Sequence, residues 1–311
     1  MIDDGDDQRG HSDTDRVVPV ALDGARVDHA LAELFELPTA AARRLLHAGR
    51  ALVDGRARAK GDEVRAGQTL ALLGGGRWLA PKPDPRVAAL RVEATLIVVD
   101  KPAGMPCHPL VPGEGGTVVD ALSASFPEIE HASPEAPREA GLVHRLDTGT
   151  SGCLAIARSA ATWRQLRAAF AADDVEKRYQ ALVQGHVAGA RTVDAPVAHD
   201  PTDARRMRLD PSGRAARSDV RPLASGAACS LVEVVMHGGR RHQLRVHLAS
   251  LGHPIVGDVL YGATAANDAP WPLLHAGSLT LPGYARVVAP LPTALLAAAR
   301  ARGLAVQPEA P

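Results

Sequence analysis

The sequence predicts a two-domain protein of mixed α and β structure, in which a small domain precedes a large one. Helical repeats of apolar residues alternate with short β-branched or alternating runs, a pattern typical of helices packed on a mixed sheet. At 311 residues the chain has the length for one large and one small domain. Residues 74–85, rich in Gly and Pro, are expected to be the linker between them.

The small domain is expected at residues 17–73, after an acidic segment, residues 1–16, that is predicted to be disordered because it is so polar. Apolar residues at helical spacing, helix-stop signals and an Asp-Gly turn define its elements. They are helices at 27–34 and 39–49 and strands at 51–53 and 69–73.

The large domain is expected at residues 86–303 and is followed by a tail, residues 304–311. Its predicted strands are 96–100, 154–156, 179–183, 218–223 and 229–236, and its predicted helices are 163–170, 244–251 and 293–302. Residues 127–138, rich in Pro and Glu, are expected to be an exposed excursion, and the polar residues 191–217 a surface loop.

The overall charge is balanced, since 35 Lys and Arg face 35 Asp and Glu, which is not the excess expected of a non-specific nucleic-acid binder. Local basic clusters are nevertheless present, and the acidic head offsets them in the total. They lie at 43–44, 56–60, 205–208 and 240–241. Each can be a solvated face or a contact for RNA. Only nine aromatic residues argue against a sheet lined with stacking rings.

No segment is long and apolar enough to cross a membrane, and the acidic start lacks the features of a signal peptide, so we expect no membrane partner and a cytoplasmic location. The cysteines show no metal or redox spacing and are expected to be reduced and buried. They are Cys107, Cys153 and Cys229. The histidines between 237 and 253 also lack metal-site spacing, so no metal is expected.

One stretch carries an acid among apolar neighbours. Residues 141–152 read GLVHRLDTGTSG, and the apolar run 154–156 follows, which indicates that Asp147 lies on a loop entering a buried strand. The polar side chains around it, among them His144 and Arg145, cost free energy beside apolar strands unless they are used. The alternative is a simple turn in which Asp147 caps its own backbone.

Two further motifs combine polar groups with a predicted element. Residues 238–247 read GGRRHQLRVH. A basic helix with a buried leucine stripe explains the leucines that begin at Leu244, but it does not explain His242, Gln243 and Arg245. Tyr179 follows Glu-Lys-Arg at the start of a predicted strand, and it can be either a core ring or a ring that stacks on a base.

Together the three motifs resemble those of the RluA family of RNA pseudouridine synthases, over residues 84–299. The resemblance implies an α+β fold with a bent, mostly antiparallel mixed sheet and a central cleft. It implies that Asp147 is the catalytic residue, Arg245 its partner and Tyr179 the ring on the target base. It assigns to Arg145 the entry into the RNA helix when the base is flipped. The other implied RNA contacts are His144, Arg240, His242 and Gln243.

The sequence departs from the family pattern in two places. Arg241 stands where Thr is usual, which adds a charge near the implied site. Thr148 and Gly149 replace a common Lys-Asp pair, which removes two charges beside the catalytic acid. Both changes concern contacts around the site and leave Asp147, Tyr179 and Arg245 in place.

The implied reaction breaks the glycosidic bond of a uridine, turns the uracil and rejoins it through carbon 5. Because no electrons are gained or lost overall, no cofactor is expected. The carboxylate of Asp147 can act as a nucleophile on the ribose or as a base that removes a sugar proton, and the sequence leaves both roles open.

Residues 17–73 resemble the RNA-binding alpha-L domain, which makes Arg43, Arg44 and Arg50 implied RNA contacts. The alternative is a small protein-interaction domain of similar pattern. The pairing of the two domains resembles the RluC and RluD branches, so we expect a protein that modifies large-subunit (23S) ribosomal RNA. We also expect a monomer. Transfer RNA is the alternative substrate, and a non-catalytic RNA-binding factor of ribosome assembly is the alternative function; the intact catalytic set argues against the latter.

Overall fold

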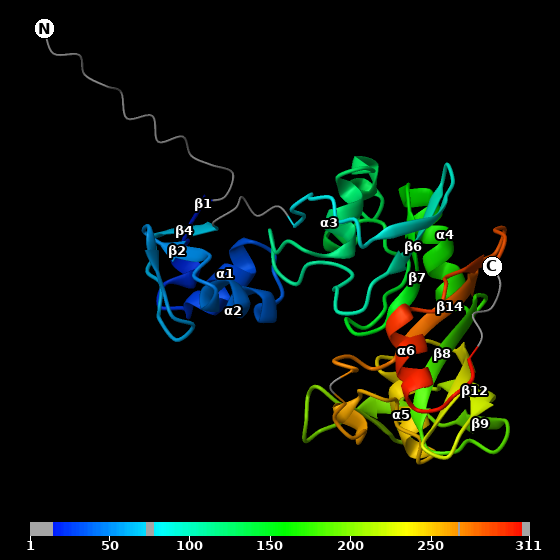
Figure 1. Ribbon diagram of the computed structural model, residues 1–311. Helices are drawn as coiled ribbons and strands as arrows, with labels where there is room; N and C mark the ends of the chain where they lie inside the picture. The colour runs from blue at the N-terminus through cyan, green and yellow to red at the C-terminus, as the bar shows by residue number, and fades with distance from the viewer. Residues whose placement is uncertain (1–14, 73–77, 267, 307–311) are drawn as a thin grey trace, which may run out of the picture. The chain divides into compact units, whose positions relative to one another are not determined.

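The chain forms two compact units (Figure 1). A computed structural model of the protein describes residues 15–72, 78–266 and 268–306. The small unit contains the described residues up to Pro81 together with the segment Pro109–Gly115, and the large unit contains the remainder. Segment Pro109–Gly115 lies within the predicted large domain, but it belongs to the small unit because Val111 is buried in that unit's apolar core. The sequence gives no sign of this insertion.

The small unit packs two helices against a four-stranded antiparallel sheet of order β1-β4-β2-β3. Its elements are β1 (Asp15–Val17), α1 (Val27–Leu34), α2 (Thr39–His47), β2 (Ala51–Val53), β3 (Arg56–Ala57) and β4 (Thr69–Leu72). The helices bury Leu31 and Leu45 against Leu70 of the sheet. Strand β1 includes Asp15 and Arg16, although the polarity of the sequence predicts both in the disordered head.

The large unit is built on a mixed sheet whose described residues form nine strands. The order is β5-β6-β7-β14-β8-β13-β12-β9, and β15 pairs with β14. The strands are β5 (Ala88–Val92), β6 (Leu96–Lys101), β7 (Ser151–Ala157), β8 (Glu176–Gln184), β9 (Arg191–Asp194), β12 (Arg217–Ser225), β13 (Cys229–His237), β14 (Leu274–Thr280) and β15 (Val287–Val288). Every pairing in this sheet is antiparallel except that of β7 with β14. The predicted mostly antiparallel mixed sheet is confirmed.

The helices of the large unit cover this sheet at separate places (Figure 1). They are α3 (Val118–Ser123), α4 (Ala160–Ala171), α5 (Gln243–Ser250) and α6 (Thr293–Ala301). Helix α4 packs Trp163 and Leu166 in the cluster that contains residues of β6 and β7. Helix α6 packs Leu295 with Leu182 of β8 in a second cluster. None of the helices formed by the described residues has the length and apolar composition needed to span a bilayer.

Two strand regions differ from the sequence prediction. Residues 191–217, expected to be a surface loop, contain β9, the start of β12 and a separate two-stranded sheet of β10 (Val197–His199) and β11 (Met207–Leu209). These strands are short and carry charged residues, so their apolar alternation is weak. Strand β14 was not predicted as a strand, because its sequence LHAGSLT is rich in small and polar residues.

Several expectations fall on residues outside the described ranges. They concern most of the acidic head, residues 1–14, the glycines of the expected linker, residues 74–76, and the last five residues of the tail. The expected excursion at 127–138 contains two short 3₁₀ turns, Pro127–His131 and Pro137–Glu139.

Candidate active site

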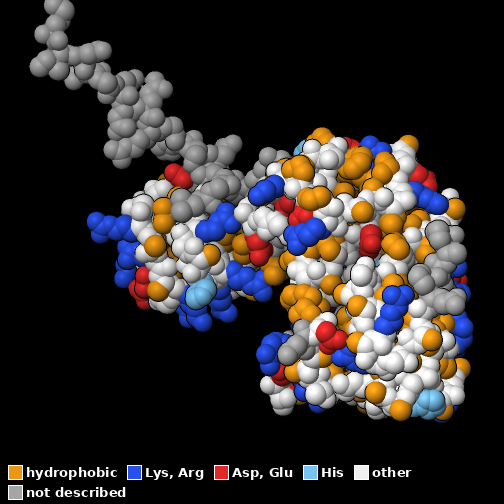
Figure 2. Space-filling view, viewed as in Figure 1, with side chains coloured by type: hydrophobic (Ala, Val, Ile, Leu, Met, Phe, Trp, Pro, Cys, Tyr) orange, Lys and Arg blue, Asp and Glu red, His pale blue; other side chains and the backbone are white. Residues whose placement is uncertain are grey.

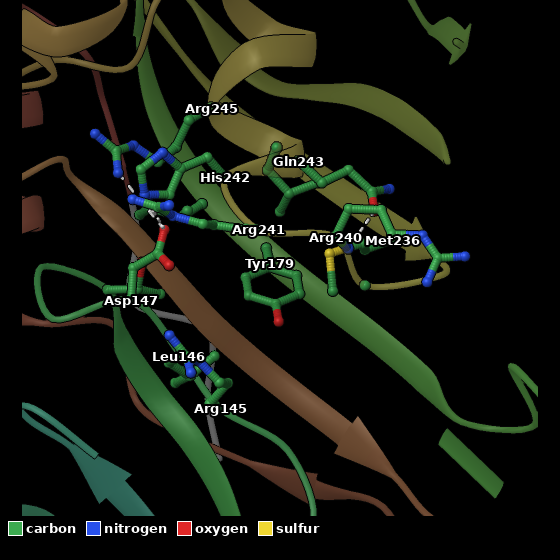
Figure 3. A pocket seen from close by; sticks show the side chains of 14 residues that line it. Arg145, Leu146, Asp147, Tyr179, Met236, Arg240, Arg241, His242, Gln243 and Arg245 are labelled. Carbon is green, nitrogen blue, oxygen red and sulfur yellow. Dashed lines mark hydrogen bonds and ion pairs between the residues drawn. The ribbon is translucent and has the colours of Figure 1, made fainter. Parts of the chain in front are cut away.

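A cavity of about 340 Å³ opens on one face of the large sheet, within the size range of small-molecule sites (Figure 3). Its walls come from the loop before β7, from β8 and from the loop that leads into α5. The residues that line it are Arg145, Leu146, Asp147, Thr150, Tyr179, Met236, Gly239, Arg240, Arg241, His242, Gln243, Leu244, Arg245 and Leu274. The three sequence motifs therefore meet at one place.

Asp147 lies in the loop that leads into β7, an interior strand of the large sheet. Leu142 bridges Ile156 of β7, and Thr150 donates its backbone N–H to the Asp147 carbonyl, at 3.0 Å. Gly152 has φ +107°, and a Cβ built on it would lie 2.3 Å from the Ala276 carbonyl oxygen of β14. Only glycine lets β7 and β14 approach this closely at the end of the loop.

Two buried side chains, Lys101 and Cys107, hold the backbone of the Asp147 loop. The Lys101 ammonium, at the end of β6, donates to the carbonyls of Pro102, Met105 and Thr148 at 2.9, 2.7 and 3.0 Å. Burial lowers the pKa of Lys101 to about 8, opposed by the charge of the nearby Asp147. The Cys107 thiol contacts both the carbonyl and the N–H of Leu146, at 3.3 and 3.4 Å. The residue on each side of Asp147 is thus fixed.

The Asp147 carboxylate faces the Arg245 guanidinium but does not hydrogen-bond to it. Its Oδ2 lies 3.6 Å from Arg245 Nη1 and 3.8 Å from His242 Nε2, distances longer than a hydrogen bond. Its side chain is 28% exposed, toward the cavity. Among the described residues no hydrogen bond holds this carboxylate, so its oxygens are available to a substrate.

Arg245 is held by a different acid. Its Nε and Nη2 donate to Asp258 Oδ2 and Oδ1 at 2.6 and 2.8 Å, a bidentate pair. Burial alone would lower the pKa of Arg245, but the hydrogen bonds and charge of Asp258, with Asp147, outweigh it and raise the pKa. Arg245 is thus a fixed cation whose third nitrogen faces Asp147.

His242 completes this side of the cavity in the left-handed conformation, with φ 55°. Tyr261 Oη accepts the Met207 N–H at 2.8 Å and lies 2.9 Å from His242 Nδ1, so the phenol can donate to that nitrogen. Burial lowers the pKa of His242 to about 4, so the ring is neutral near pH 7. With Nδ1 accepting, the ring proton is on Nε2, which faces Asp147.

Tyr179 lies on β8 with its ring against the cavity beside Asp147 (Figure 3). The side chain is buried, and burial followed by the charge of Asp147 raises its pKa, so the phenol stays protonated. A single ring in this position offers one apolar face to a planar base next to the carboxylate.

Comparisons with known proteins identify the family of this chain. Residues 95–250 match the sequence pattern of the RNA pseudouridylate synthase family. An uncharacterised RNA pseudouridine synthase of Chloroflexus aurantiacus is 38% identical over 255 residues, which are 79% of this chain and 78% of the relative. The chain belongs to the RNA pseudouridylate synthase family. A ribosomal large subunit pseudouridine synthase D of Pseudomonas aeruginosa is 34% identical, over 79% of this chain and 76% of the relative.

Solved structures of RNA pseudouridylate synthases share the fold of the large unit. The human RNA pseudouridylate synthase domain containing 1 protein matches with a TM-score of 0.56 and 27% identity, over 68% of this chain and 86% of that chain. The human domain containing 4 protein matches with a TM-score of 0.56 and 24% identity, over 70% of this chain and 94% of that chain. The α+β class predicted from the sequence is that of the family.

Three polar residues of the α5 motif, Arg240, Arg241 and Gln243, hydrogen-bond to the backbone around the cavity. Gln243 is buried; its amide nitrogen donates to the Arg217 and His237 carbonyls at 2.9 Å each, and its oxygen accepts the Arg240 N–H at 3.0 Å. Arg240 Nε donates to the Ala215 carbonyl at 3.1 Å. Arg241 donates to the carbonyls of Ala204 and Arg205. Gln243 therefore shapes the loop, whereas both arginines border the opening.

The structure separates Arg145 from His144. Arg145 is exposed, lines the cavity and forms no hydrogen bond or ion pair among the described residues. His144 points away: its ring stacks on Phe170 with centroids 4.7 Å apart, and its Nε2 accepts the Ala155 N–H at 3.0 Å. Burial lowers the pKa of His144 to about 3. His144 is thus not brought into the cavity group, and its contacts are structural.

The three arginines expected to contact RNA in the small unit have different surroundings. Arg43 Nε donates to Asp28 Oδ2 at 2.7 Å, and Asp28 is buried. Arg50 is half-buried, with Nη2 2.5 Å from the position of a Cβ on Gly113. Arg44 is exposed on α2. Figure 2 shows Lys and Arg side chains gathered along one side of this unit.

Sequence reasoning missed the residues that position Asp147 and Arg245. Asp258, Tyr261, Lys101 and Cys107 all contact residues of the Asp147 and Arg245 motifs. The available signal was an isolated acid in the apolar stretch IVGDVLYG, residues 255–262, where an unpaired charge would be costly. Lys101 ends an apolar strand in the same way.

Proposed function

We propose that this synthase isomerises specific uridines of large-subunit ribosomal RNA. The observation that carries the chemistry is the ionisable Asp147 at the cavity, beside the Arg245 cation and the Tyr179 ring. The substrate class is supported by relatives named ribosomal large subunit pseudouridine synthase D, such as that of Pseudomonas aeruginosa and that of Xanthomonas campestris, which is 37% identical over 79% of this chain.

The bonds exchanged define what the site must do. The bond from uracil N1 to ribose C1′ breaks, and a bond from C5 to C1′ forms; C5 loses a proton to solvent and N1 gains one. The uracil must be held while it turns, so the cavity must enclose it. Tyr179 supplies a stacking face, and the cavity volume of about 340 Å³ admits a base and its ribose.

Asp147 acts at the ribose. Attack on C1′ and removal of a sugar proton both require the carboxylate, and Arg245 Nη1 lies 3.6 Å from its Oδ2 without hydrogen-bonding it. Neutral His242 offers its Nε2 proton at the same oxygen. Arg145 is proposed to enter the RNA where the flipped uridine leaves a gap, a role supported by its exposure at the cavity.

The small unit is proposed to hold the RNA. Its exposed basic residues support this role through phosphate contacts. The exposed Lys and Arg among the described residues of this unit are Arg16, Arg26, Arg43, Arg44, Arg56, Lys60 and Arg65. A truncation that removes residues 17–73 also removes the partners of Val111, so charge-reversing substitutions such as Arg44→Glu with Arg56→Glu test tethering better than deletion. Unchanged affinity for ribosomal RNA in this double variant would exclude the role.

The substrate is tested by carbodiimide mapping of pseudouridines in ribosomal and transfer RNA from parent and deletion strains. We expect positions in large-subunit RNA to disappear on deletion and to return with the wild-type gene but not with Asp147→Asn. Loss of a transfer RNA position instead would show that the substrate is transfer RNA. Persistence of every position, with purified protein also inactive on unmodified transcripts, would favour a non-catalytic role.

A further inference from the structure

An exposed tryptophan lies beside the catalytic loop. Trp271 is 43% exposed, whereas Trp163 of the same unit is buried in the cluster under α4. Isolated apolar residues on a surface are common and need no explanation by themselves. The surroundings of Trp271 are more specific, because its ring rests on two glycines that adjoin the Asp147 loop.

The ring lies on bare backbone. A Cβ built on Gly104 would lie 2.9 Å from the indole Nε1, and one built on Gly149 would lie 3.3 Å from Trp271 Cε3. Gly149 is two residues after Asp147, and the Gly104 N–H donates to the Thr148 carbonyl at 2.8 Å. The absence of side chains at Gly104 and Gly149 lets the indole approach the backbone of these two turns closely.

The backbone of Trp271 is fixed from the other side. A Cβ built on Gly257, which precedes Asp258, would lie 2.5 Å from the Trp271 carbonyl oxygen. The Leu273 N–H donates to the Val256 carbonyl at 2.9 Å. The indole is therefore anchored to the segment that supplies Asp258 and supported by the loop that supplies Asp147, so it is a rigid apolar surface.

A rigid exposed ring at this place matches a need of the reaction. Flipping a uridine out of an RNA helix breaks the stacking of its neighbours, and RNA-binding proteins commonly restore stacking with aromatic side chains. Tyr179 lies inside the cavity and is buried, so it serves the flipped base itself. The exposed Trp271 ring is therefore available to stack on a base outside the cavity.

We propose that Trp271 stacks on an unpaired base of the RNA substrate next to the target uridine. The inference rests on the proposed function and adds to it: the enzyme selects sites where a neighbour of the target is free to leave the RNA stack. Stacking is tolerant of base identity because every base has a π face, so the preference is for an unpaired neighbour rather than for a particular letter.

The first test separates binding from turnover. Trp271→Leu keeps apolar bulk over Gly104 and Gly149 but removes the aromatic face, and Trp271→Phe restores a ring. On in vitro transcribed large-subunit ribosomal RNA we expect the Leu variant to raise Kd about 5-fold to 100-fold, with Phe intermediate and kcat at saturating RNA within about twofold of wild type. Val288→Ala, which trims another exposed apolar side chain of the large unit, should leave Kd unchanged.

The second test locates the base. In a short synthetic RNA carrying the modified uridine, each neighbour is replaced in turn by an abasic nucleotide. We expect one replacement to weaken binding of the wild-type enzyme and to have little further effect on the Leu variant, which is the signature of a direct pair.

The outcomes distinguish the inference from the function. If wild type turns over and the Leu variant binds equally well, or loses kcat without a change in Kd, the ring only supports the loop and the inference is wrong. The inference is also wrong if no abasic position couples to Trp271. If wild-type enzyme forms no pseudouridine in any transcript, the proposed function itself fails.

Discussion

Asp258 accepts two hydrogen bonds from Arg245, of 2.6 and 2.8 Å, and is itself 1% exposed. The pair leaves Arg245 Nη1 pointing at Asp147, 3.6 Å from its Oδ2. A buried charge pair of this kind holds its partner in one orientation because any other arrangement would leave the Asp258 carboxylate unpaired. The position of the cation that faces Asp147 therefore depends on a residue that does not line the cavity.

Replacement of Asp258 by Asn is expected to slow the reaction without abolishing RNA binding. Asn keeps the shape but replaces charge-assisted hydrogen bonds by weaker neutral ones, so Arg245 loses its fixed orientation. We expect kcat to fall about tenfold or more, a rise in activation free energy of about 1.4 kcal/mol, with Kd for RNA within about threefold. Single-turnover rates and RNA affinity measured together test this.

The matched control is Asp268→Asn. Asp268 forms the same kind of pair with Arg302, at 2.7 and 3.0 Å, but is about half exposed. Exposed ion pairs contribute little, so both stability and kcat should remain close to wild type. If the two Asn variants slow the reaction equally, orientation of Arg245 is not the reason for the effect at Asp258.

Lys101→Met is expected to loosen the Asp147 loop. The change leaves the carbonyls of Pro102 and Met105 without their ammonium donor and releases Thr148 from it. Unpaired buried carbonyls cost about 1–3 kcal/mol each, so the free energy of unfolding should fall by several kcal/mol and kcat should fall with it. Denaturant unfolding and turnover measure the two effects; exposed Lys82→Met is the control. Wild-type stability in the Lys101 variant would contradict the bracing role.

Arg43 and Arg44 are neighbours on α2 but should behave differently. Arg43 hydrogen-bonds the buried Asp28, which Arg26 also contacts, so Arg43→Ala should lower the free energy of unfolding by about 1–2 kcal/mol. Arg44 is exposed, so Arg44→Ala should leave stability unchanged, weaken RNA binding and reduce the salt dependence of log K by about one. Unfolding and salt titrations test both. The reverse pattern would exclude the assignment.

Acid should destabilise the protein through its buried histidines. His275 lies between Ser151 and the Ala289 carbonyl, and burial lowers its pKa to about 4 from about 6.5. Between these values the unfolded chain holds the extra proton, so the free energy of unfolding should fall by about 1.4 kcal/mol per pH unit as pH drops from 6.5 to 4. His144 and His242 act in the same direction.

Urea unfolding at intervals from pH 7 to pH 4.5 measures that slope. His275→Gln should reduce the slope relative to wild type, whereas His131→Gln, at an exposed position, should not change it. Equal slopes in wild type and His275→Gln would show that His275 is protonated as readily in the folded protein as in the unfolded chain.

Sequence patterns predicted the parts of the site that lie within single motifs. The loop of Asp147, the strand of Tyr179 and the helix of Arg245 follow from apolar periodicity and the polar residues beside it, and the structure brings all three to one cavity. The pattern could not show that Arg245 is held by Asp258, because that pair joins residues 13 positions apart whose side-chain directions only the packed fold determines.

Other differences between the sequence predictions and the structure also arise from packing that the sequence pattern does not show. Arg43 and Arg44 are adjacent and alike in sequence, but the contact of α2 with α1 turns Arg43 toward Asp28. His144 shares the motif of Asp147, yet the pairing of its segment with β7 directs the ring to Phe170 instead of the cavity. Strands such as β9 to β11 are too short and polar to give a clear period.

The most direct test of the account is proton release from carbon 5 of uridine. Large-subunit ribosomal RNA transcribed with [5-³H]uridine is incubated with the wild-type protein and with Asp147→Asn, and tritium in the solvent is measured beside RNA affinity. We expect wild type to release tritium at specific sites and Asp147→Asn to bind the RNA with similar affinity but to release none. Release by Asp147→Asn at the wild-type rate would contradict the assignment of Asp147 as the catalytic residue.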